Sequence, residues 1–356
     1  MQSFNILNKN LENLFNSLGT KTMFRIDEPN LWDDLLLNCS YQLISYSHQS
    51  IDFQLAYQKG HGGDWEDLSV IILWDNKPVA LWPLSVSRRE GITLISSHGQ
   101  PILPPFFSNS INNKIQKQIN KNCLDIVEIL AKELGIDNLE SSYSYNGLHS
   151  ISNWHTQSMK RGAKCNVLHE LFVDLQDDLS IIRSNFRSSY KSLINSGLRM
   201  WGVNVLCLAD ESIWREFRKL HLEVSGRITR SDETWELQLN NIARGKALLI
   251  YLNDDKGKMV GGGFFDFTRD EALYSVAAYD RSLFDKPLGH VVQYRAIEEF
   301  KKRGLKWYKI GVRSYPSDLN KPTDKEISIG EFKEGFATHI SPKFHLIHKK
   351  ILNNGL

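Results

Sequence analysis

Residues 221–231 gather side chains that could perform acid–base chemistry and bind anions. The segment contains His221, Glu223, Arg227 and Arg230, together with three hydroxyl side chains, at the end of a stretch with helical periodicity. A carboxylate or an imidazole can accept a proton from a nucleophile. A guanidinium group binds phosphate or carboxylate through two parallel hydrogen bonds. We interpret the segment as a substrate-binding loop. The alternative is a solvent-exposed helix end with a glycine cap.

Near the end of the sequence, a lysine lies within an aromatic segment. Phe332 and Phe336 are one helical turn apart, and Lys333 lies between them. An ammonium group in a pocket can stabilise negative charge that develops on a carbonyl oxygen, or it can hold a carboxyl or phosphate group. The other interpretation places both phenylalanines in a core and Lys333 in solvent.

Two more polar side chains follow an apolar run that ends at Gly311. Arg313 and Tyr315 come directly after this run, which is typical of a strand. Because loops at the ends of neighbouring strands often build the sites of α/β proteins, we expect both residues to contact substrate.

The elements that must position these residues occur in the same order in both halves of the sequence. Each half has apolar strands joined by short turns, then a loop rich in Gly and Pro, a helix, a glycine and a last strand. In the first half the strands are expected at 69–74, 78–86, 92–96 and 136–142, and the helix at 111–134. In the second half the strands are expected at 247–252, 259–267, 272–279 and 305–310, and the helix at 290–302.

This repeated order predicts two mixed α/β domains in tandem. The alternative is a chance match between two unrelated α/β domains. Between the halves we expect a strand at 171–174 and helices at 178–197, 211–224 and 232–243. A short polar and basic segment at 158–166 places the boundary, so the predicted domains are residues 1–165 and 166–356.

Composition indicates an ordinary globular protein. Of the 356 residues, 41% are apolar and 24% are charged, and the net charge is only +2. This charge does not by itself indicate nucleic-acid binding, although a local patch could still contact a tRNA. The four cysteines form no CxxC pair, so neither a disulfide framework nor a metal site is expected. Without a signal peptide or an apolar run long enough to span a bilayer, a cytoplasmic location is expected.

Four segments of the second half resemble the Fem-type peptidyltransferases and their relatives in the GNAT superfamily. The similar segments are a basic helix ending in Gly, a glycine-rich hairpin that ends at Tyr279, a helix and strand ending in Gly, and a Phe-Lys-x-x-Phe motif. They lie at 183–197, 261–281, 288–311 and 329–336. Only the last motif is specific by itself, and the resemblance extends over about residues 171–336.

The resemblance implies an enzyme built from two tandem GNAT-like domains that transfers an activated acyl group to an amine. It places Lys333 near the reacting carbonyl, Phe332 in the wall of the pocket and Tyr279 among the substrate-binding residues. Fem-type enzymes use aminoacyl-tRNA as the donor, and the wider superfamily uses acyl-CoA. The protein is therefore expected to use one of these co-substrates, without a tightly bound cofactor.

The loop before the 290–302 helix bears on the choice of donor. GNAT enzymes bind the pyrophosphate of CoA with a glycine-rich turn at a helix N-terminus. Here the turn retains Gly289 only, and Pro287 lacks a backbone N–H group. This departure argues against tight CoA binding. His290, the next residue, is a candidate base, or alternatively a capping or packing residue.

The sequence thus predicts an acyltransferase that forms an amide on an amine of a cell-envelope precursor, either a peptide stem or an amino sugar. The acceptor is expected to be a small molecule or a lipid- or nucleotide-linked glycan or peptide. We expect Lys333, His290 and Glu223 to be catalytic. The alternatives are an acyl-CoA-dependent N-acyltransferase of a nucleotide-linked amino sugar, and a non-catalytic GNAT pair that serves as a binding module.

Overall fold

The computed structural model describes residues 4–144 and 152–349, which divide into two compact units. Unit 1 comprises Met1–Val167 and Pro342–Leu356, and unit 2 comprises Leu168–Ser341. The predicted single boundary at 165/166 therefore omits the return of the chain to unit 1. This return has a structural cause, because β15 (His339–His348) pairs antiparallel with β8 (Leu139–Ser144), a strand of unit 1.

Unit 1 contains six helices and eight further strands in its described part. Its helices are α1 (Phe4–Ser17), α2 (Pro29–Leu37), η1 (Ile44–Tyr46), α3 (His48–Gly60), α4 (Asn113–Glu133) and α5 (Asn153–Lys160). Besides β15, its strands are β1 (Lys21–Phe24), β2 (Asp64–Asp67), β3 (Val70–Trp74), β4 (Lys77–Trp82), β5 (Ser85–Arg89), β6 (Ile92–Ser96), β7 (Phe106–Phe107) and β8.

The core of unit 1 lies on both faces of the sheet β1-β3-β4-β7. Successive residues of a strand point to opposite faces, and β3 follows this rule. Val70 and Ile72 pack with Trp82 in one cluster, whereas Ile71 packs with Trp32 of α2 in the other. The single strand predicted at 78–86 is wrong, since β4 and β5 are separate strands that belong to different sheets.

Unit 2 contains the following elements. Its strands are β9 (Lys164–Asp174, which begins in unit 1), β10 (Gly202–Leu206), β11 (Ala247–Asn253), β12 (Met259–Phe267), β13 (Glu271–Tyr279) and β14 (Trp307–Arg313). Its helices are α6 (Leu179–Ser184), α7 (Ser188–Met200), α8 (Glu211–Ser225), α9 (Asp232–Ala243), η2 (Arg281–Leu283), α10 (Leu288–Lys302) and α11 (Asp324–Glu334).

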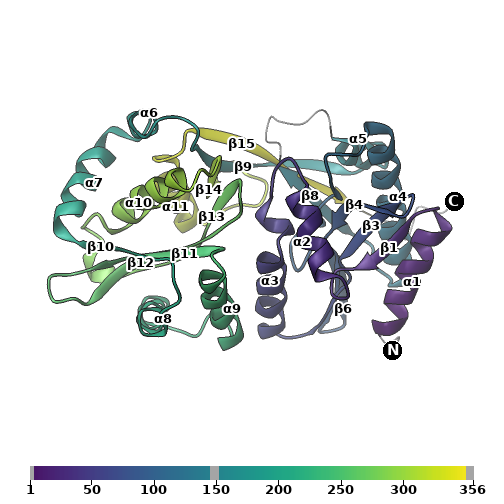
Figure 1. The fold of residues 1–356 in the computed structure, drawn as a ribbon, viewed down its shortest axis with the longest axis horizontal. Coiled ribbons are helices and arrows are strands. Elements are labelled where there is room, and N and C mark those ends of the chain that lie inside the picture. Colours follow the sequence, from purple (N-terminus) through teal and green to yellow (C-terminus); the bar gives the residue numbers. More distant parts are fainter. Residues whose placement is uncertain (1–3, 145–151, 350–356) are drawn as a thin grey trace. The chain divides into compact units, whose positions relative to one another are not determined.

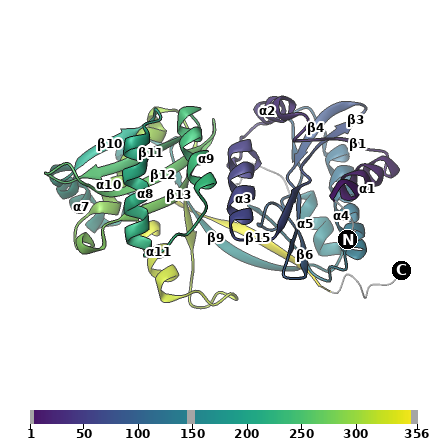
Figure 2. The same cartoon turned by 90° about the horizontal axis from the view of Figure 1, so that it is seen from below.

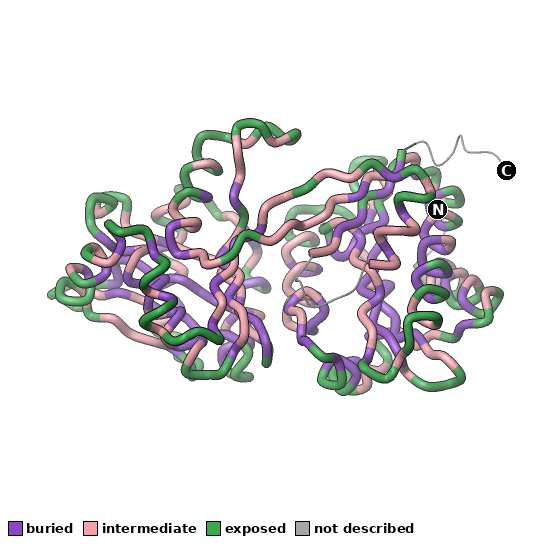
Figure 3. Tube along the Cα trace, turned by 90° about the horizontal axis from the view of Figure 1, so that it is seen from above, coloured by how far each residue is buried: buried purple, intermediate pink, exposed green. Residues whose placement is uncertain are grey.

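The sheet of unit 2 has the order β10-β11-β12-β13-β14-β9. Strands β10 to β13 form an antiparallel meander, and α10 connects β13 to its parallel neighbour β14. Leu249 of β11 packs in the cluster of α8 and α9, whereas Leu248 and Ile250 pack in the cluster of α7 and α10. Figures 1 and 2 show these two helical layers on opposite faces of the sheet. Most residues of β11 and β12 are buried, and Figure 3 colours the chain by burial.

The predicted mixed α/β class is confirmed, with one error in the second half. The helix expected at 178–197 is broken between α6 and α7. The break arises because the backbone N–H of Arg187 donates to the carbonyl of Gly335, 2.8 Å away, instead of continuing a helix. None of the helices in the described ranges is both long and apolar enough to traverse a bilayer.

Candidate active site

Two parallel strands in the middle of unit 2 separate soon after they pair. Strands β13 and β14 are aligned only from Glu271 opposite Trp307 to Leu273 opposite Lys309. Beyond this point β13 continues to pair with β12 and β14 continues to pair with β9, with an irregularity between Lys309 and Gly311. We call the region where the two strands diverge the fork. Its two arms are residues 274–279 and 310–313.

The last turn of α11 places the ammonium group of Lys333 within the fork. Its Nζ atom lies 5.5 Å from the ring centroid of Tyr274, on one arm. On the other arm, a Cβ atom built on Gly311 would fall 2.5 Å from the same nitrogen. Only a glycine at 311 leaves this space open, so the lysine is placed by the residues of both arms.

Lys333 is a partly buried cation, and none of the described residues provides a counter-ion. Burial lowers the pKa of its ammonium group. Its side chain forms no hydrogen bond or ion pair with any residue in the described ranges. By contrast, Lys309 at the base of the fork pairs with the buried carboxylate of Glu170. A desolvated, unpaired ammonium costs stability, and such groups are characteristic of sites where a ligand or a transition state supplies the missing charge.

Aromatic side chains form one wall beside Lys333. Phe332 lies against Gly289, where an added Cβ would come within 3.0 Å of the phenylalanine ring. The His290 ring is 4.5 Å from that of Tyr190 and 5.1 Å from that of Phe332, centroid to centroid. Burial, assisted by the charge of Arg187, lowers the pKa of His290 to about 4. The imidazole is therefore neutral near pH 7 and is a weak base.

Hydrogen bonds join the polar groups of the aromatic side chains in and beside the fork. The hydroxyl groups of Tyr274 and Tyr279 are 2.8 Å apart, and Tyr308 donates to the fully buried Gln293. Burial raises the pKa of Tyr274 to about 12, so this hydroxyl keeps its proton. This hydrogen-bonded group of side chains is thus neutral, and Lys333 is the charged group beside it.

The first turn of α7 fixes the position of the lysine. Tyr190 donates to the carbonyl of Phe332 at 3.1 Å, and Arg187 donates to the carbonyl of Glu331 at 3.0 Å. Gly335 lies against the Tyr190 ring. These contacts hold the C-terminal turn of α11, where a cation also interacts favourably with the helix dipole.

The other predicted residues of this region have structural partners. Arg313 pairs with Glu334 at 3.0 Å and with Glu331 at 3.3 Å, both on α11. Its guanidinium carbon lies 4.6 Å from the ring centroid of Tyr315. Arg313 therefore supports α11, and Tyr315 packs against Arg313.

The predicted residues of segment 221–231 lie in and beside the helical layer of α8 and α9. The guanidinium carbon of Arg230 lies 3.5 Å from the ring centroid of Trp235, and the His221 ring is 5.2 Å from the same indole. Burial and the charge of Arg230 lower the pKa of His221. Glu223 and Arg227 are exposed. The structure thus gathers Arg230 and His221 but leaves Glu223 and Arg227 in solvent.

Sequence reasoning missed several residues of the fork. Tyr274, Gln293 and Tyr190 lie within the segments that resemble Fem-type proteins, but nothing in those segments singled them out. Their placement depends on strand divergence and on contacts between distant segments. A signal in the sequence was the glycine at 311, which comes at the end of a strand pattern. In the structure its φ is 152°, at which other residues are strained.

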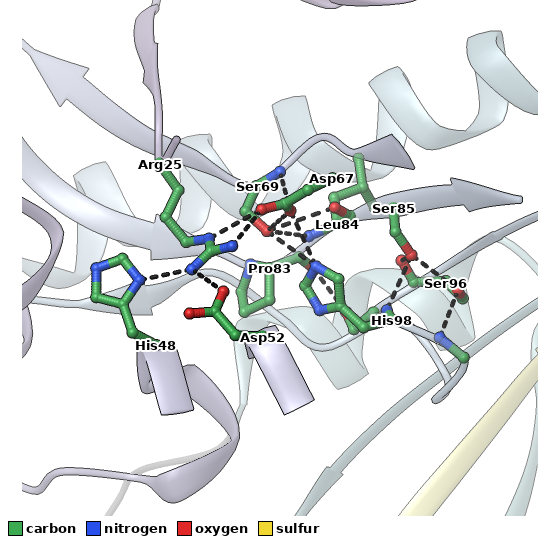
Figure 4. A network of polar contacts seen from close by, with 12 residues as sticks. Arg25, His48, Asp52, Asp67, Ser69, Pro83, Leu84, Ser85, Ser96 and His98 are labelled. Atoms are coloured by element: carbon green, nitrogen blue, oxygen red, sulfur yellow. Dashed lines mark hydrogen bonds and ion pairs between the residues drawn. The ribbon is translucent and has the colours of Figure 1, made fainter. Parts of the chain in front are cut away.

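Unit 1 holds a second cluster of charged residues, which is fully paired (Figure 4). Arg25 pairs with Asp67 at 2.6 Å and with Asp52 at 2.9 Å, and the other oxygen of Asp67 is 3.0 Å from Nε2 of His98. Ser69 donates to Asp67 at 2.6 Å. Burial would raise the pKa of Asp67, but the hydrogen bond and charge of His98 and the charge of Arg25 hold it well below its usual range.

Comparison with known proteins identifies the fold. The sequence matches no protein-family model and no curated protein. The structure is similar to that of FemX over 89% of this chain and 95% of FemX, with 13% sequence identity and a TM-score of 0.65. L-PGS from Bacillus licheniformis is similar over 92% of this chain and 93% of its own, with 14% identity and a TM-score of 0.56.

A third similar structure is the C-terminal domain of a putative lysylphosphatidylglycerol synthetase from Agrobacterium fabrum. It covers 85% of this chain and 93% of its own, with 11% identity and a TM-score of 0.54. The chain has the FemX fold. The prediction of two tandem GNAT-like domains of the Fem type is therefore confirmed at the level of the fold.

Proposed function

We propose that this protein is an acyltransferase whose unit 2 transfers an acyl or aminoacyl group to an amine of a cell-envelope precursor. The observation that carries the proposal is the unpaired ammonium of Lys333 inside the fork. The similarity to FemX supports an envelope peptide or amino sugar as the acceptor. The third similar structure is named as part of a putative lysylphosphatidylglycerol synthetase, and an aminoacylated lipid as product supports the wider class of envelope acceptors.

In this reaction the neutral amine nitrogen attacks the carbonyl carbon of the donor. The C–O bond of an ester, or the C–S bond of a thioester, then breaks as the amide forms. Negative charge develops on the carbonyl oxygen in the transition state, and Lys333 provides a fixed positive charge where water is partly excluded. His290 contributes an uncharged wall, since its lowered pKa leaves it neutral at the working pH.

The packing around Gly289 favours aminoacyl-tRNA over acyl-CoA as the donor. Phe332 lies against this residue, at the N-terminus of α10 where a GNAT enzyme would hold a pyrophosphate. Pro287 precedes the helix and provides no backbone N–H group. In an aminoacyl-tRNA, an ester joins the acyl group to a ribose. With this ribose outside the fork, the donor needs no pyrophosphate-binding site at the N-terminus of α10.

We assign acceptor binding to the α8–α9 layer of unit 2. Arg230 has the guanidinium group that phosphate or carboxylate groups of an envelope precursor would need, and Trp235 holds its plane in place. Arg227 on the same loop is exposed and could contact the same anionic acceptor from the solvent side.

The test is a product assay with each donor offered separately. Purified protein is incubated with acetyl-CoA or with a charged tRNA, and with UDP-linked muropeptide or UDP-linked amino sugar as the acceptor. Mass spectrometry should detect an aminoacylated acceptor with the charged tRNA. Product with acetyl-CoA alone would favour the N-acyltransferase of a nucleotide-linked amino sugar. Binding of an acceptor without product from either donor would favour a non-catalytic binding module.

A further inference from the structure

A carboxyl group lies one strand away from the fork, on the face of the sheet opposite the Tyr274 ring. Asp266 of β12 is aligned with Leu273 of β13, and Leu273 is the last residue of β13 that pairs with β14. Asp266 is thus level with the point where the two parallel strands begin to separate, with β13 between them. Asp266 lies within the 261–281 segment that resembles the Fem-type hairpin, but its residue type and spacing did not single it out.

The register of β12 and β13 explains which face the carboxyl occupies. Phe264 packs in the cluster of α8 and α9, whereas the next residue, Phe265, packs in the cluster of α7 and α10. Because side chains alternate along a strand, Asp266 returns to the α8–α9 face, where we place the acceptor. Tyr274, which contacts Lys333, packs in the opposite cluster.

An irregularity in β13 brings a hydroxyl group to this carboxyl. Phe264 is aligned with Val276 and Phe265 with Tyr274, so Ser275 is an extra residue between the two pairs. Its hydroxyl donates to Oδ2 of Asp266 at 2.6 Å. Ser275 is exposed although it lies in the middle of the sheet, so a substrate can reach this part of β13.

We propose that Asp266 is the base that accepts the proton of the acceptor amine, with Ser275 orienting its carboxylate. The assignment rests on the proposed function. A protonated acceptor gives one proton to Asp266 and becomes the neutral nucleophile. The nitrogen then attacks the donor carbonyl, and its second proton goes to the oxygen or sulfur that leaves as the C–O or C–S bond breaks. The acid form of Asp266 returns its proton to water.

The surroundings of Asp266 suit this role. Burial raises the pKa of its carboxyl to about 6, against the opposing effects of hydrogen bonds from Ser275 and Asn241 and of the charge of Arg230. A base whose pKa lies near the working pH combines a large ionised fraction with useful basicity. Of the earlier candidates, Glu223 is exposed on α8, and His221 has a lowered pKa beside Arg230.

The first test compares Asp266→Asn with a matched control, Asp255→Asn, which alters an exposed carboxylate in the turn between β11 and β12. With an alkylamine acceptor, Asp266→Asn should lower kcat by about 10²- to 10⁴-fold, the usual contribution of a general base. The control should not change kcat. With a weakly basic acceptor that is already neutral at the assay pH, the loss in Asp266→Asn should become much smaller. An equal loss with both acceptors would overturn the assignment.

The second test uses the pH profile of kcat/KM. The wild-type rate should fall with decreasing pH through about 6, and the residual rate of Asp266→Asn should lack this limb. Ser275→Ala removes a hydrogen bond to the carboxylate, so the limb should move to higher pH. An unmoved limb in Ser275→Ala, or a retained limb in Asp266→Asn, would contradict the proposal. A wild-type protein that transfers from no donor would instead overturn the proposed function itself.

Discussion

The charged cluster of unit 1 and the fork of unit 2 differ in the partners that they provide for a cation removed from water. Arg25 in unit 1 has two carboxylate partners, and Asp67 is bonded on both oxygens. Lys333 in unit 2 has no charged partner among the described residues, and the Tyr274 ring and Gly311 lie beside its ammonium. Completely satisfied charges rigidify a fold, whereas an unsatisfied charge is retained at a cost in stability. We therefore propose a structural role for the first region and a chemical role for the second.

The largest expected effect concerns the structural region. Asp67→Asn leaves the buried Arg25 with a neutral partner, and breaking a buried pair costs about 3 kcal/mol or more. Urea unfolding should show this loss in unit 1. Asp27→Asn, which alters an exposed carboxylate nearby in the sequence, should leave the unfolding midpoint unchanged. Equal stability of the two variants would mean that the cluster does not hold unit 1 together.

Gly311→Ala should disturb the fork while keeping the positive charge of Lys333. The new methyl group would displace the ammonium of Lys333, and a misplacement of about 1 Å at a reacting centre can cost about 10²-fold in rate. Gly304→Ala is the matched control, because it also places alanine at a positive φ, 76°, but meets no neighbouring atom. Steady-state kinetics should therefore show a loss of kcat in the first variant only.

Acid should act on the two units with opposite sign. The pKa of Asp67 is lower in the folded state than the unfolded value of about 4, so its contribution is present above pH 4 and is lost as the pH falls further. The pKa of Asp266 is raised to about 6, so its ionisation destabilises unit 2 as the pH rises from about 4 to 6. Urea unfolding should show the first trend as a loss of about 1 kcal/mol from pH 4 to pH 3, and the second as a loss of about 2 kcal/mol from pH 4 to pH 6. Asp67→Asn should abolish the first.

The smallest expected effect tests how the lysine is held. Tyr190→Phe removes one hydrogen bond to the carbonyl of Phe332, which contributes about 1 kcal/mol. We expect a slightly lower melting temperature and a kcat reduced by about fivefold, with KM unchanged. A changed KM with an unchanged kcat would show that Tyr190 contacts substrate instead of positioning α11.

Local patterns predicted the elements, but they did not predict the fork. The expected ranges 232–243 and 259–267 coincide with α9 and β12, because helix capping and strand alternation are visible in neighbouring residues. The break before α7 depends on the carbonyl of Gly335, and no local pattern includes that partner. The return of β15 to unit 1 was missed for the same reason.

The residues of the candidate site likewise include some that were predicted from the sequence and some that were not. The position of Lys333 followed from the Phe-Lys motif, and the structure places Phe332, His290 and Tyr279 around the same fork. Tyr274 and Asp266 were not predicted, because strand divergence and a one-residue irregularity decide which side chains meet. Exposure also separated Glu223 from His221, which their spacing in the sequence did not do.

The rate of amide formation under single-turnover conditions, with donor and acceptor both saturating, tests the role of Lys333 most directly. Lys333→Ala should lower this rate by about 10²- to 10³-fold, as expected for the loss of one group that stabilises the oxyanion. Its melting temperature should not fall, because the lost charge has no partner. Lys325→Ala, an exposed change on the same helix, should retain the wild-type rate. A Lys333→Ala rate within threefold of wild type would contradict the account.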